Sequence, residues 1–160
     1  MSRAYLSLGS NLDAETHLRD AIAALRARFG EVRLSPVYRT RAVGFDGADF
    51  LNAAAVVDSD LDPPALNDWL HALEDEHGRE RSGPRYGDRT LDIDIVLFDD
   101  LVLPGRGNLQ LPRPELKHAF VLRPLADIAP DVAVPGDGRT LAQLWAVHHE
   151  HDLPLERIEL

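Results

Sequence analysis

Two aspartates, Asp92 and Asp94, stand one residue apart in the most strand-like segment of the chain, residues 90–98 (TLDIDIVLF). Side chains alternate between the faces of a strand, so both carboxylates share one face, at backbone positions about 7 Å apart. Two like charges this close repel each other unless a cation lies between them. Hard cations such as Mg²⁺ bind carboxylate oxygens together with substrate phosphates. The pair therefore indicates a magnesium site, although an exposed acidic face would show the same pattern.

The apolar residues of the same segment bear on this choice. Strict alternation would place Val96 and Phe98 on the aspartate face, which indicates a face that is partly covered rather than fully solvated. The opposite face is then expected to be apolar throughout, with Leu91, Ile93, Ile95 and Leu97.

An arginine-rich segment directly precedes the two aspartates. It contains Arg79, Arg81, Arg85 and Arg89, four of the 17 basic residues of the chain. The planar guanidinium group suits phosphate, so this segment is expected to grip phosphate beside the metal. Gly83 and Gly87 predict a mobile lid, while a solvated charge run partly neutralised by Glu80 and Asp88 is the alternative. The chain contains no Walker-type G-x-x-x-x-G-K-[ST] motif.

An amide and two aromatic rings are candidates for binding an organic substrate. Asn52 stands among apolar residues, and its amide can donate and accept simultaneously, which matches the edge of a heterocycle. An Asn satisfied by the backbone is an equally reasonable interpretation. Phe50 and Phe120 could stack on a ring or could simply belong to the core. His148, His149 and His151 form a run that we interpret as a polar helix end rather than a metal site.

The composition limits the class of protein. A length of 160 residues suits one domain, residues 1–160, and the formal charge of −10 argues against nucleic-acid and anionic-membrane partners. No segment approaches the roughly 18 consecutive apolar residues of a membrane span. The absence of cysteine excludes disulfides and thiolate metal sites. These features fit a cytoplasmic protein; they do not indicate any protein partner.

The elements that must position these residues follow from local patterns. Strands are expected at 3–9, at 32–39 with an interruption at Pro36, and at 50–58. A helix is expected over 14–29, with Leu18, Ala21, Ile22, Leu25 and Phe29 on one face and Gly30 as its C-terminal cap. A second helix should begin after Asp62, with Pro63 at its first position, bury Leu66, Trp69, Leu70 and Leu73, and end at His77-Gly78.

The order of these elements, with strand 90–98, is βαββαβ, the pattern of ferredoxin-like folds. The predicted class is therefore α+β, with a mainly antiparallel sheet flanked by helices. Short strands near 101–103 and 109–111, proline-punctuated turns and a helix near 140–149 are expected to complete the chain.

Five segments together resemble the 6-hydroxymethyl-7,8-dihydropterin pyrophosphokinase family. They are YLSLGSNL (5–12), SPVYRT (35–40), DFLNAA (49–54), RYGDRTLDIDIVLF (85–98) and AFVLRPLADIAP (119–130). The resemblance implies an antiparallel sheet flanked by helices, ATP as pyrophosphoryl donor, two Mg²⁺ ions, a hydroxymethyl-dihydropterin acceptor and AMP as leaving group.

The resemblance also implies roles for individual residues. Asp92 and Asp94 resemble the metal ligands, and Arg79 and Arg89 the catalytic phosphate-binding arginines. Asn52 resembles the amide that reads the pterin, between Phe50 and Phe120, with Thr40 and Val43 holding the ring. The residues implied on the nucleotide side are Glu74, Arg81, Tyr86, Arg113 and His118.

Three positions depart from the family pattern. Arg113 stands where the family usually has histidine, His118 aligns where arginine is usual after a turn that is one residue short, and Asp88 replaces a common proline. These departures concern the nucleotide side of the site.

The expected function is transfer of pyrophosphate from ATP to 6-hydroxymethyl-7,8-dihydropterin in folate biosynthesis. One alternative is a related magnesium-dependent phosphotransferase with another heterocyclic acceptor. The other is a catalytically silent ligand-binding or regulatory domain, which retention of both aspartates and of the arginine segment argues against.

Overall fold

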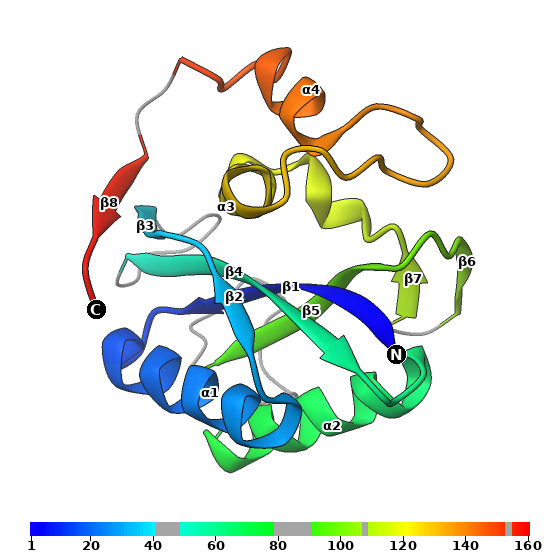
Figure 1. Ribbon diagram of the computed structural model, residues 1–160. Coiled ribbons are helices and arrows are strands. Elements are labelled where there is room, and N and C mark those ends of the chain that lie inside the picture. Colours follow the sequence, from blue (N-terminus) through cyan, green and yellow to red (C-terminus); the bar gives the residue numbers. More distant parts are fainter. Residues whose placement is uncertain (41–48, 79–90, 107–108, 153–154) are drawn as a thin grey trace.

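The computed structural model describes residues 1–40, 49–78, 91–106, 109–152 and 155–160. In these residues a mainly antiparallel sheet is covered by helices on both faces (Figure 1). The strands and helices in chain order are β1 (Ser2–Ser10), α1 (Ala14–Phe29), β2 (Val32–Leu34), β3 (Val37–Thr40), β4 (Phe50–Ser59), α2 (Pro63–Glu76), β5 (Asp92–Phe98), β6 (Leu103–Arg106), β7 (Leu109–Leu111), the 3₁₀ helix η1 (Pro114–Lys117), α3 (Ala119–Ile128), α4 (Leu141–Ala146) and β8 (Glu156–Ile158).

The strand order confirms the predicted ferredoxin-like arrangement. The main sheet runs β5-β1-β4-β3-β8, with β2 also paired to β4, and β6 and β7 form a separate hairpin. Among the described residues, all strand pairings in the main sheet are antiparallel. Strand β1 therefore lies between β4, which carries Asn52, and β5, which carries Asp92 and Asp94.

Both long helices have the predicted bounds because their ends carry strong local signals. The side chain of Asp62 accepts a hydrogen bond from the N–H of Ala65 at 2.9 Å, which caps α2. Gly30 has a φ of 84° and donates its N–H to the carbonyl of Arg26, which ends α1. Gly78, with a φ of 77°, follows the end of α2 in the same conformational region.

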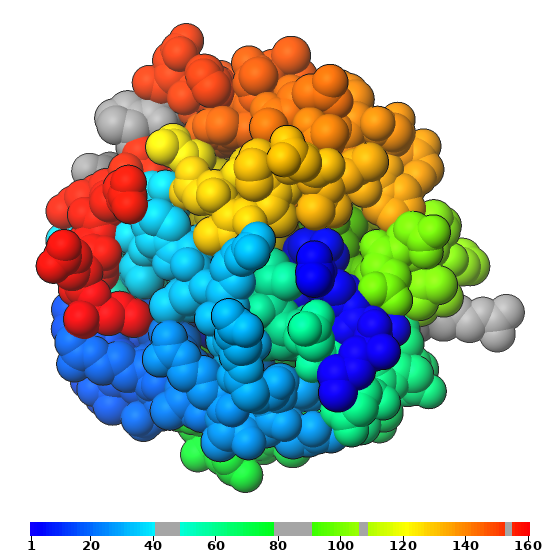
Figure 2. Space-filling model, in the orientation of Figure 1, coloured from blue at the N-terminus to red at the C-terminus, as the bar shows by residue number. Residues whose placement is uncertain are grey.

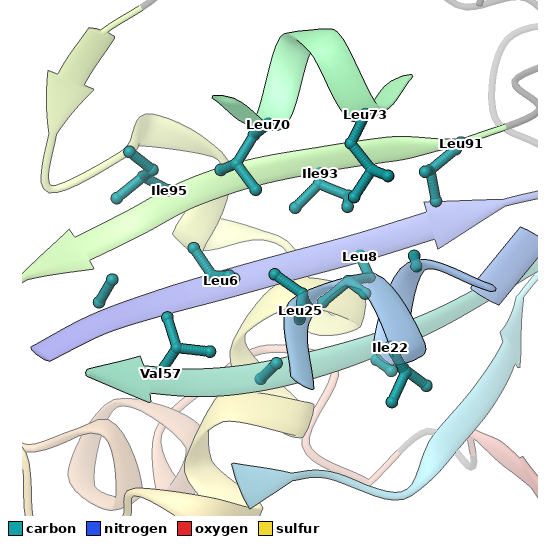
Figure 3. Close-up of a cluster of buried hydrophobic side chains, with 14 of the residues drawn as sticks. Leu6, Leu8, Ile22, Leu25, Val57, Leu70, Leu73, Leu91, Ile93 and Ile95 are labelled. Carbon is teal, nitrogen blue, oxygen red and sulfur yellow. The ribbon is translucent and has the colours of Figure 1, made fainter. Parts of the chain in front are cut away.

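One core layer lies between the sheet and the pair α1 and α2 (Figure 3). The residues labelled there come from these helices, from β1, β4 and β5, and from the position just before β5: Leu6, Leu8, Ile22, Leu25, Val57, Leu70, Leu73, Leu91, Ile93 and Ile95. Phe29 and Trp69 close this layer with an edge-to-face contact at 5.2 Å between ring centroids.

The second core layer lies on the opposite face of the sheet, under α3 and α4. Helix α3 was not expected, because Pro124 inside it interrupts the helical pattern and removes one backbone hydrogen bond. Burial of Val121, Leu122 and Leu125 on the sheet offsets that loss. Strand β8 was also not expected; it pairs with β3 at the edge of the sheet.

Several predicted boundaries were wrong. Pro36 divides the expected strand 32–39 into β2 and β3, and Ser35 between them still bonds to β4, because its Oγ accepts from the N–H of Ala54 at 2.7 Å. The first strand of the hairpin is at 103–106 rather than 101–103, and α4 ends at Ala146 rather than near residue 149.

The alternation expected in β5 holds only as far as Ile95. Leu6 pairs with Ile95 and Tyr5 with Leu97, so Val96 is a β-bulge without a partner in β1. Val96 and Leu97 consequently both lie in the layer under α3, whereas Phe98 lies in the layer of α1 and α2. The assignments of Leu97 and Phe98 by strict alternation were therefore wrong. Asp92 and Asp94, which precede the bulge, keep their shared face.

Candidate active site

The predicted site residues of the sheet lie at one end of the face that α3 covers. Gly9 of β1 pairs with Asp92 on one side and with Asn52 on the other, so these three residues form one row across the sheet. A spacing of about 4.8 Å between strands puts Asp92 and Asn52 about 10 Å apart. Because Ile93, Leu51 and their alternating neighbours point to the layer of α1 and α2, the aspartates and the amide face the other way.

Gly9 lies in the middle of this row but is not among the predicted site residues. It stands at the end of the expected strand 3–9, and β1 extends one residue further, to Ser10. A Cβ atom at residue 9 would lie 3.2 Å from Oδ1 of Asn52, so a side chain here would crowd the amide. A glycine within an alternating strand is the signal that could have found it, since such glycines mark close approach.

The amide of Asn52 is buried, with 5% of the residue exposed. Its Nδ2 donates a hydrogen bond to Oγ1 of Thr40 on the adjacent strand β3 at 2.8 Å. This bond fixes the orientation of the amide, and the register places Phe50 opposite Thr40 on the same face. The structure therefore brings together Thr40, Phe50 and Asn52, whereas Val43 lies outside the described residues.

The two aspartates interact strongly with each other. The side chain of Asp94 is 23% exposed. Burial raises the pKa of Asp94 well above its usual range, and the charge of Asp92 raises it further, as do the charge of Glu74 and a hydrogen bond with Asp92. The Arg113 guanidinium lowers the pKa of Asp94 again, because it stabilises the ionised carboxylate. A carboxylate pair whose ionisation is opposed in this way is suited to a divalent cation.

Arg113 lies against this pair from outside the sheet. Its Nη2 atom is 3.3 Å from Oδ1 of Asp94, and its Nε atom is 3.1 Å from Oε2 of Glu115. Its backbone N–H donates at 3.0 Å to the carbonyl of Val96, the bulge residue. The bulge therefore anchors the backbone of Arg113, whose side chain reaches Asp94.

Glu74 supports the aspartate strand from α2. It is 1% exposed, and its Oε2 atom accepts a hydrogen bond from the N–H of Ile93 at 3.0 Å. Its carboxylate thus binds the backbone between Asp92 and Asp94. The expectation of an acidic group near the site fits this position, but the contact seen here is with the protein backbone.

Phe120 and His118 lie together at the start of α3. Their rings are stacked, with 5.1 Å between centroids and 8° between planes. Phe120 packs against the core layer beneath α3, on the same side of the sheet as Asn52. Burial lowers the pKa of His118 below its usual value, and the charge of Lys117 lowers it further. The remaining predicted residues, Arg79, Arg81, Tyr86 and Arg89, lie outside the described residues.

The histidine run near the C-terminus gathers possible metal ligands directly after the end of α4. In the part of the chain that the structure describes, His148, His149 and Glu150 form the one group of three whose ligand atoms lie within 4.8 Å of one another. His148 uses both ring nitrogens locally: Nδ1 accepts from the N–H of Glu150 at 3.0 Å, and Nε2 is 2.7 Å from the carbonyl oxygen of Lys117. This contact pattern supports a structural role for His148.

A separate hollow of about 270 Å³ lies at the opposite end of the same sheet face. It is lined by residues of β1, β2 and β4 and by the end of α3, including Arg3, Tyr5, Arg33 and Ile128. Figure 2 shows the face on which these segments meet, with the N-terminal residues in dark blue and α3 in yellow. None of the predicted site residues lines this hollow.

The helices that the structure describes include none with the length and apolar character of a membrane span.

Comparison with known proteins relates the whole described site to one family. A model of 7,8-dihydro-6-hydroxymethylpterin-pyrophosphokinase matches residues 5–130. The chain is 42% identical over 170 residues to the 2-amino-4-hydroxy-6-hydroxymethyldihydropteridine pyrophosphokinase of Pseudomonas aeruginosa, covering 99% of this chain and 96% of that protein. The Bacillus subtilis protein of the same name is 40% identical over 134 residues, covering 81% of this chain and 79% of that one.

Solved structures share the fold. The structure of Plasmodium falciparum HPPK-DHPS wild type with pteroate matches with a TM-score of 0.74 and 14% identity, covering 95% of this chain and 45% of that one. The wild type with SDX-DHP matches with a TM-score of 0.71. The chain spans 48% of the length of that second protein. At this identity the likeness shows the fold alone, and it confirms the α+β sheet predicted from the sequence.

Proposed function

The chain belongs to the 7,8-dihydro-6-hydroxymethylpterin-pyrophosphokinase family, and from this membership we propose that it transfers pyrophosphate from ATP to 6-hydroxymethyl-7,8-dihydropterin in folate biosynthesis. The observation that carries the proposal is the family match over residues 5–130, which includes most of β1 and all of β4 and β5. Residues 1–160 would then act as one pyrophosphokinase domain, with ATP and the pterin as its small-molecule substrates.

The pterin would bind at the Asn52 end of the row. The amide, oriented by Thr40, can donate to and accept from the edge of the ring. Phe50 and Phe120 would cover the faces of the ring, and Val43 would add backbone contacts. Gly9 leaves the space beside Asn52 open, so the hydroxymethyl group can point along the row towards Asp92.

Asp92 and Asp94 would hold Mg²⁺, two ions in the expected arrangement. Their donor set fits this cation, because two carboxylates that oppose each other's ionisation gain from a divalent charge between them. Magnesium usually takes one or two carboxylates and completes its shell with water and substrate phosphates. When bound, the metal would lower the negative charge of the phosphate chain that the nucleophile approaches.

The nucleotide would lie on the arginine side of the aspartates. Arg79 and Arg89 would stabilise the charge that spreads over the transferred group, and Arg81 and Tyr86 would add contacts to the nucleotide. Arg113 lies beside Asp94 and His118 lies near the start of α3, so either side chain could contact phosphate. Glu74 would act through the backbone of β5 and not on the nucleotide directly.

The reaction is an in-line displacement. The hydroxymethyl oxygen of the pterin forms a bond to the β-phosphorus of ATP, while the bond from this phosphorus to the oxygen bridging to the α-phosphate breaks. AMP leaves with the electron pair of that bond, and the proton of the attacking hydroxyl group is lost to a phosphate oxygen or to solvent. The protein residues orient the hydroxyl group and the phosphate chain for this geometry and exclude water as a competing acceptor.

The identity of the nucleotide product tests this proposal. Purified protein is mixed with Mg²⁺, ATP and 6-hydroxymethyl-7,8-dihydropterin, and the nucleotides are separated by chromatography. AMP formed in step with a pyrophosphorylated pterin supports the proposal. ADP would indicate ordinary kinase chemistry, and the absence of either product would indicate a binding domain.

A further inference from the structure

The backbone of Arg113 is held on both sides. Its N–H donates to the carbonyl of Val96, and its carbonyl oxygen accepts from the N–H of Leu116 at 3.1 Å, within the turn that leads into η1. The position of its Cα atom relative to β5 is therefore fixed by backbone bonds that do not involve the guanidinium group. The side chain can change its partners without moving the chain that carries it.

The guanidinium group bridges two carboxylates. It contacts Oδ1 of Asp94 at 3.3 Å and Oε2 of Glu115 at 3.1 Å, and the side chain of Arg113 is 21% exposed. A half-buried ion pair of this kind interacts more strongly than an exposed surface pair. In the absence of a metal, Arg113 is thus a permanent positive charge beside Asp94, whose carboxylate also feels the charges of Asp92 and Glu74.

A metal ion on Asp94 would compete with this contact. Mg²⁺ requires carboxylate oxygens at about 2.0–2.1 Å in near-octahedral geometry. A guanidinium group on the same oxygen occupies one of its acceptor directions and repels the incoming cation. An arginine side chain remains charged at any working pH, so it can give way only by moving, never by losing its proton.

We propose that Arg113 is an exchangeable counter-ion of Asp94, which a divalent cation displaces when it binds. This inference rests on the proposed function, because it assumes that Asp92 and Asp94 hold the metal. The displaced guanidinium retains Glu115 as a partner and becomes available to the phosphate groups that arrive with the metal. Metal affinity is then set partly by the free energy needed to break the contact between Arg113 and Asp94.

The test uses Mn²⁺ alone, with no nucleotide, and measures free Mn²⁺ by electron paramagnetic resonance. Arg113→Gln should bind Mn²⁺ roughly tenfold more tightly than the wild type. This change in affinity corresponds to a modest part of the interaction energy between two charges about 4 Å apart. Arg113→Lys keeps the charge and should stay within about threefold of the wild type. Arg28→Gln is the matched control: it removes one charge from a partly exposed arginine paired with Asp60, and should leave the affinity unchanged.

A second readout follows the wild-type side chain itself. Addition of Mg²⁺ should shift the Nε–H signal of Arg113 in a ¹⁵N spectrum, with Arg113→Lys serving to assign the signal. This measurement keeps the inference testable even if Arg113→Gln does not fold. An unmoved signal at saturating Mg²⁺ overturns the inference.

Asp94→Asn separates the inference from its premise. It should abolish Mn²⁺ binding both alone and combined with Arg113→Gln. If Asp94→Asn abolishes binding but Arg113→Gln binds no more tightly than the wild type, the counter-ion role of Arg113 is wrong while the metal site stands. If Asp94→Asn binds Mn²⁺ as the wild type does, both the metal site and the inference are overturned.

Discussion

The carboxylate of Glu74 accepts a hydrogen bond from the backbone N–H of Ile93, the residue that lies between Asp92 and Asp94. A side chain on a helix thus fixes the backbone whose two neighbouring side chains are the candidate metal ligands. Since Glu74 is fully buried, loss of this acceptor would leave a buried N–H without its partner.

Two replacements of Glu74 should distinguish the effect of its hydrogen bond on stability from the effect of its charge. Glu74→Leu removes the acceptor and should lower the free energy of unfolding by about 1–3 kcal/mol, whereas Glu74→Gln keeps an acceptor oxygen and should lose less. Chemical denaturation measures both, and amide exchange at Ile93 should accelerate only in Glu74→Leu. Glu76→Gln, an exposed change on the same helix, is the control. Equal stability of the two Glu74 variants would contradict the assigned role.

Replacement of Asp94 should change how the stability of the metal-free protein depends on pH. An unfolded aspartate titrates near 3.9, and the raised pKa of Asp94 means that the folded protein binds more protons above that pH. The contribution of Asp94 to stability therefore falls as pH rises from about 4 through the raised pKa, and stays low above it. The asparagine of Asp94→Asn cannot titrate, so this part of the decrease in stability with rising pH should disappear.

At pH 7 in a chelator, Asp94→Asn should therefore be at least as stable as the wild type, although nearly all turnover is lost. Denaturation curves at several pH values, with the exposed variant Asp100→Asn as control, measure the difference. Wild-type turnover in Asp94→Asn at ordinary Mg²⁺ concentrations would refute the metal-binding role. A variant much less stable than the wild type at pH 7 would show that the contact with Arg113 outweighs the repulsion.

Replacement of Asn52 should weaken pterin binding selectively. Asn52→Ala leaves polar groups of the bound ring unpaired, at a cost of about 1–3 kcal/mol, or roughly ten- to a hundredfold in affinity. Thr40→Val removes the bond that orients the amide, so it should cause a smaller loss in the same direction. Calorimetry with the pterin and with an ATP analogue measures both affinities. Equal losses for both ligands would indicate a general packing defect instead.

His118 is expected to respond to nucleotide binding. Burial lowers the pKa of His118 in the free protein, so its ring is largely neutral at pH 7. If its ring contacts phosphate, binding of a non-hydrolysable ATP analogue should raise that pKa, because an adjacent anion favours the protonated form. Nuclear magnetic resonance titration of the ring protons measures the pKa with and without the analogue.

The matching binding experiment uses His118→Gln, which cannot carry the charge. Between pH 6 and 8 the affinity of the wild type for the analogue should fall more steeply with pH than that of the variant. The phosphates of the analogue titrate in the same range, so only the difference between the two proteins is informative. Parallel curves, with no change in the pKa of His118, would mean that the ring serves only to stack on Phe120.

The helices with caps could be predicted almost to the residue, because the signals lie within the helix itself. Asp62 followed by Pro63, and Gly30 after an apolar stripe, each act over a few residues. Helix α3 could not be predicted in this way, because its stability comes from packing on the sheet rather than from its own residues. Pro124 within it gives a local signal that tertiary burial overrides.

The placement of some candidate residues on one sheet face was predictable, but their contacts were not. The shared face of Asp92 and Asp94 follows from alternation, and the isolated amide of Asn52 is visible in its strand. Glu74 on helix α2 contacts Ile93 of β5, and Arg113 in the loop before η1 contacts Asp94 of β5. The two residues of each pair are 19 positions apart in the chain. Such contacts depend on how the elements pack, which no local pattern in the chain encodes.

The bulge at Val96 restricts the number of residues in β5 more strongly than it restricts their amino-acid types. The bulge reverses the alternation of side chains between the two faces of β5. The aspartates before it therefore face the proposed ligand site, while Phe98 beyond it faces the layer of α1 and α2. Substitutions that preserve polarity can be accommodated one at a time. A one-residue insertion or deletion between Asp94 and Phe98 would instead move side chains of one core layer to the other in one half of the strand and would displace the carbonyl that anchors Arg113. We therefore expect natural and engineered relatives to keep the number of residues in this strand constant and to retain Asp92 and Asp94, while its apolar positions vary among apolar residues.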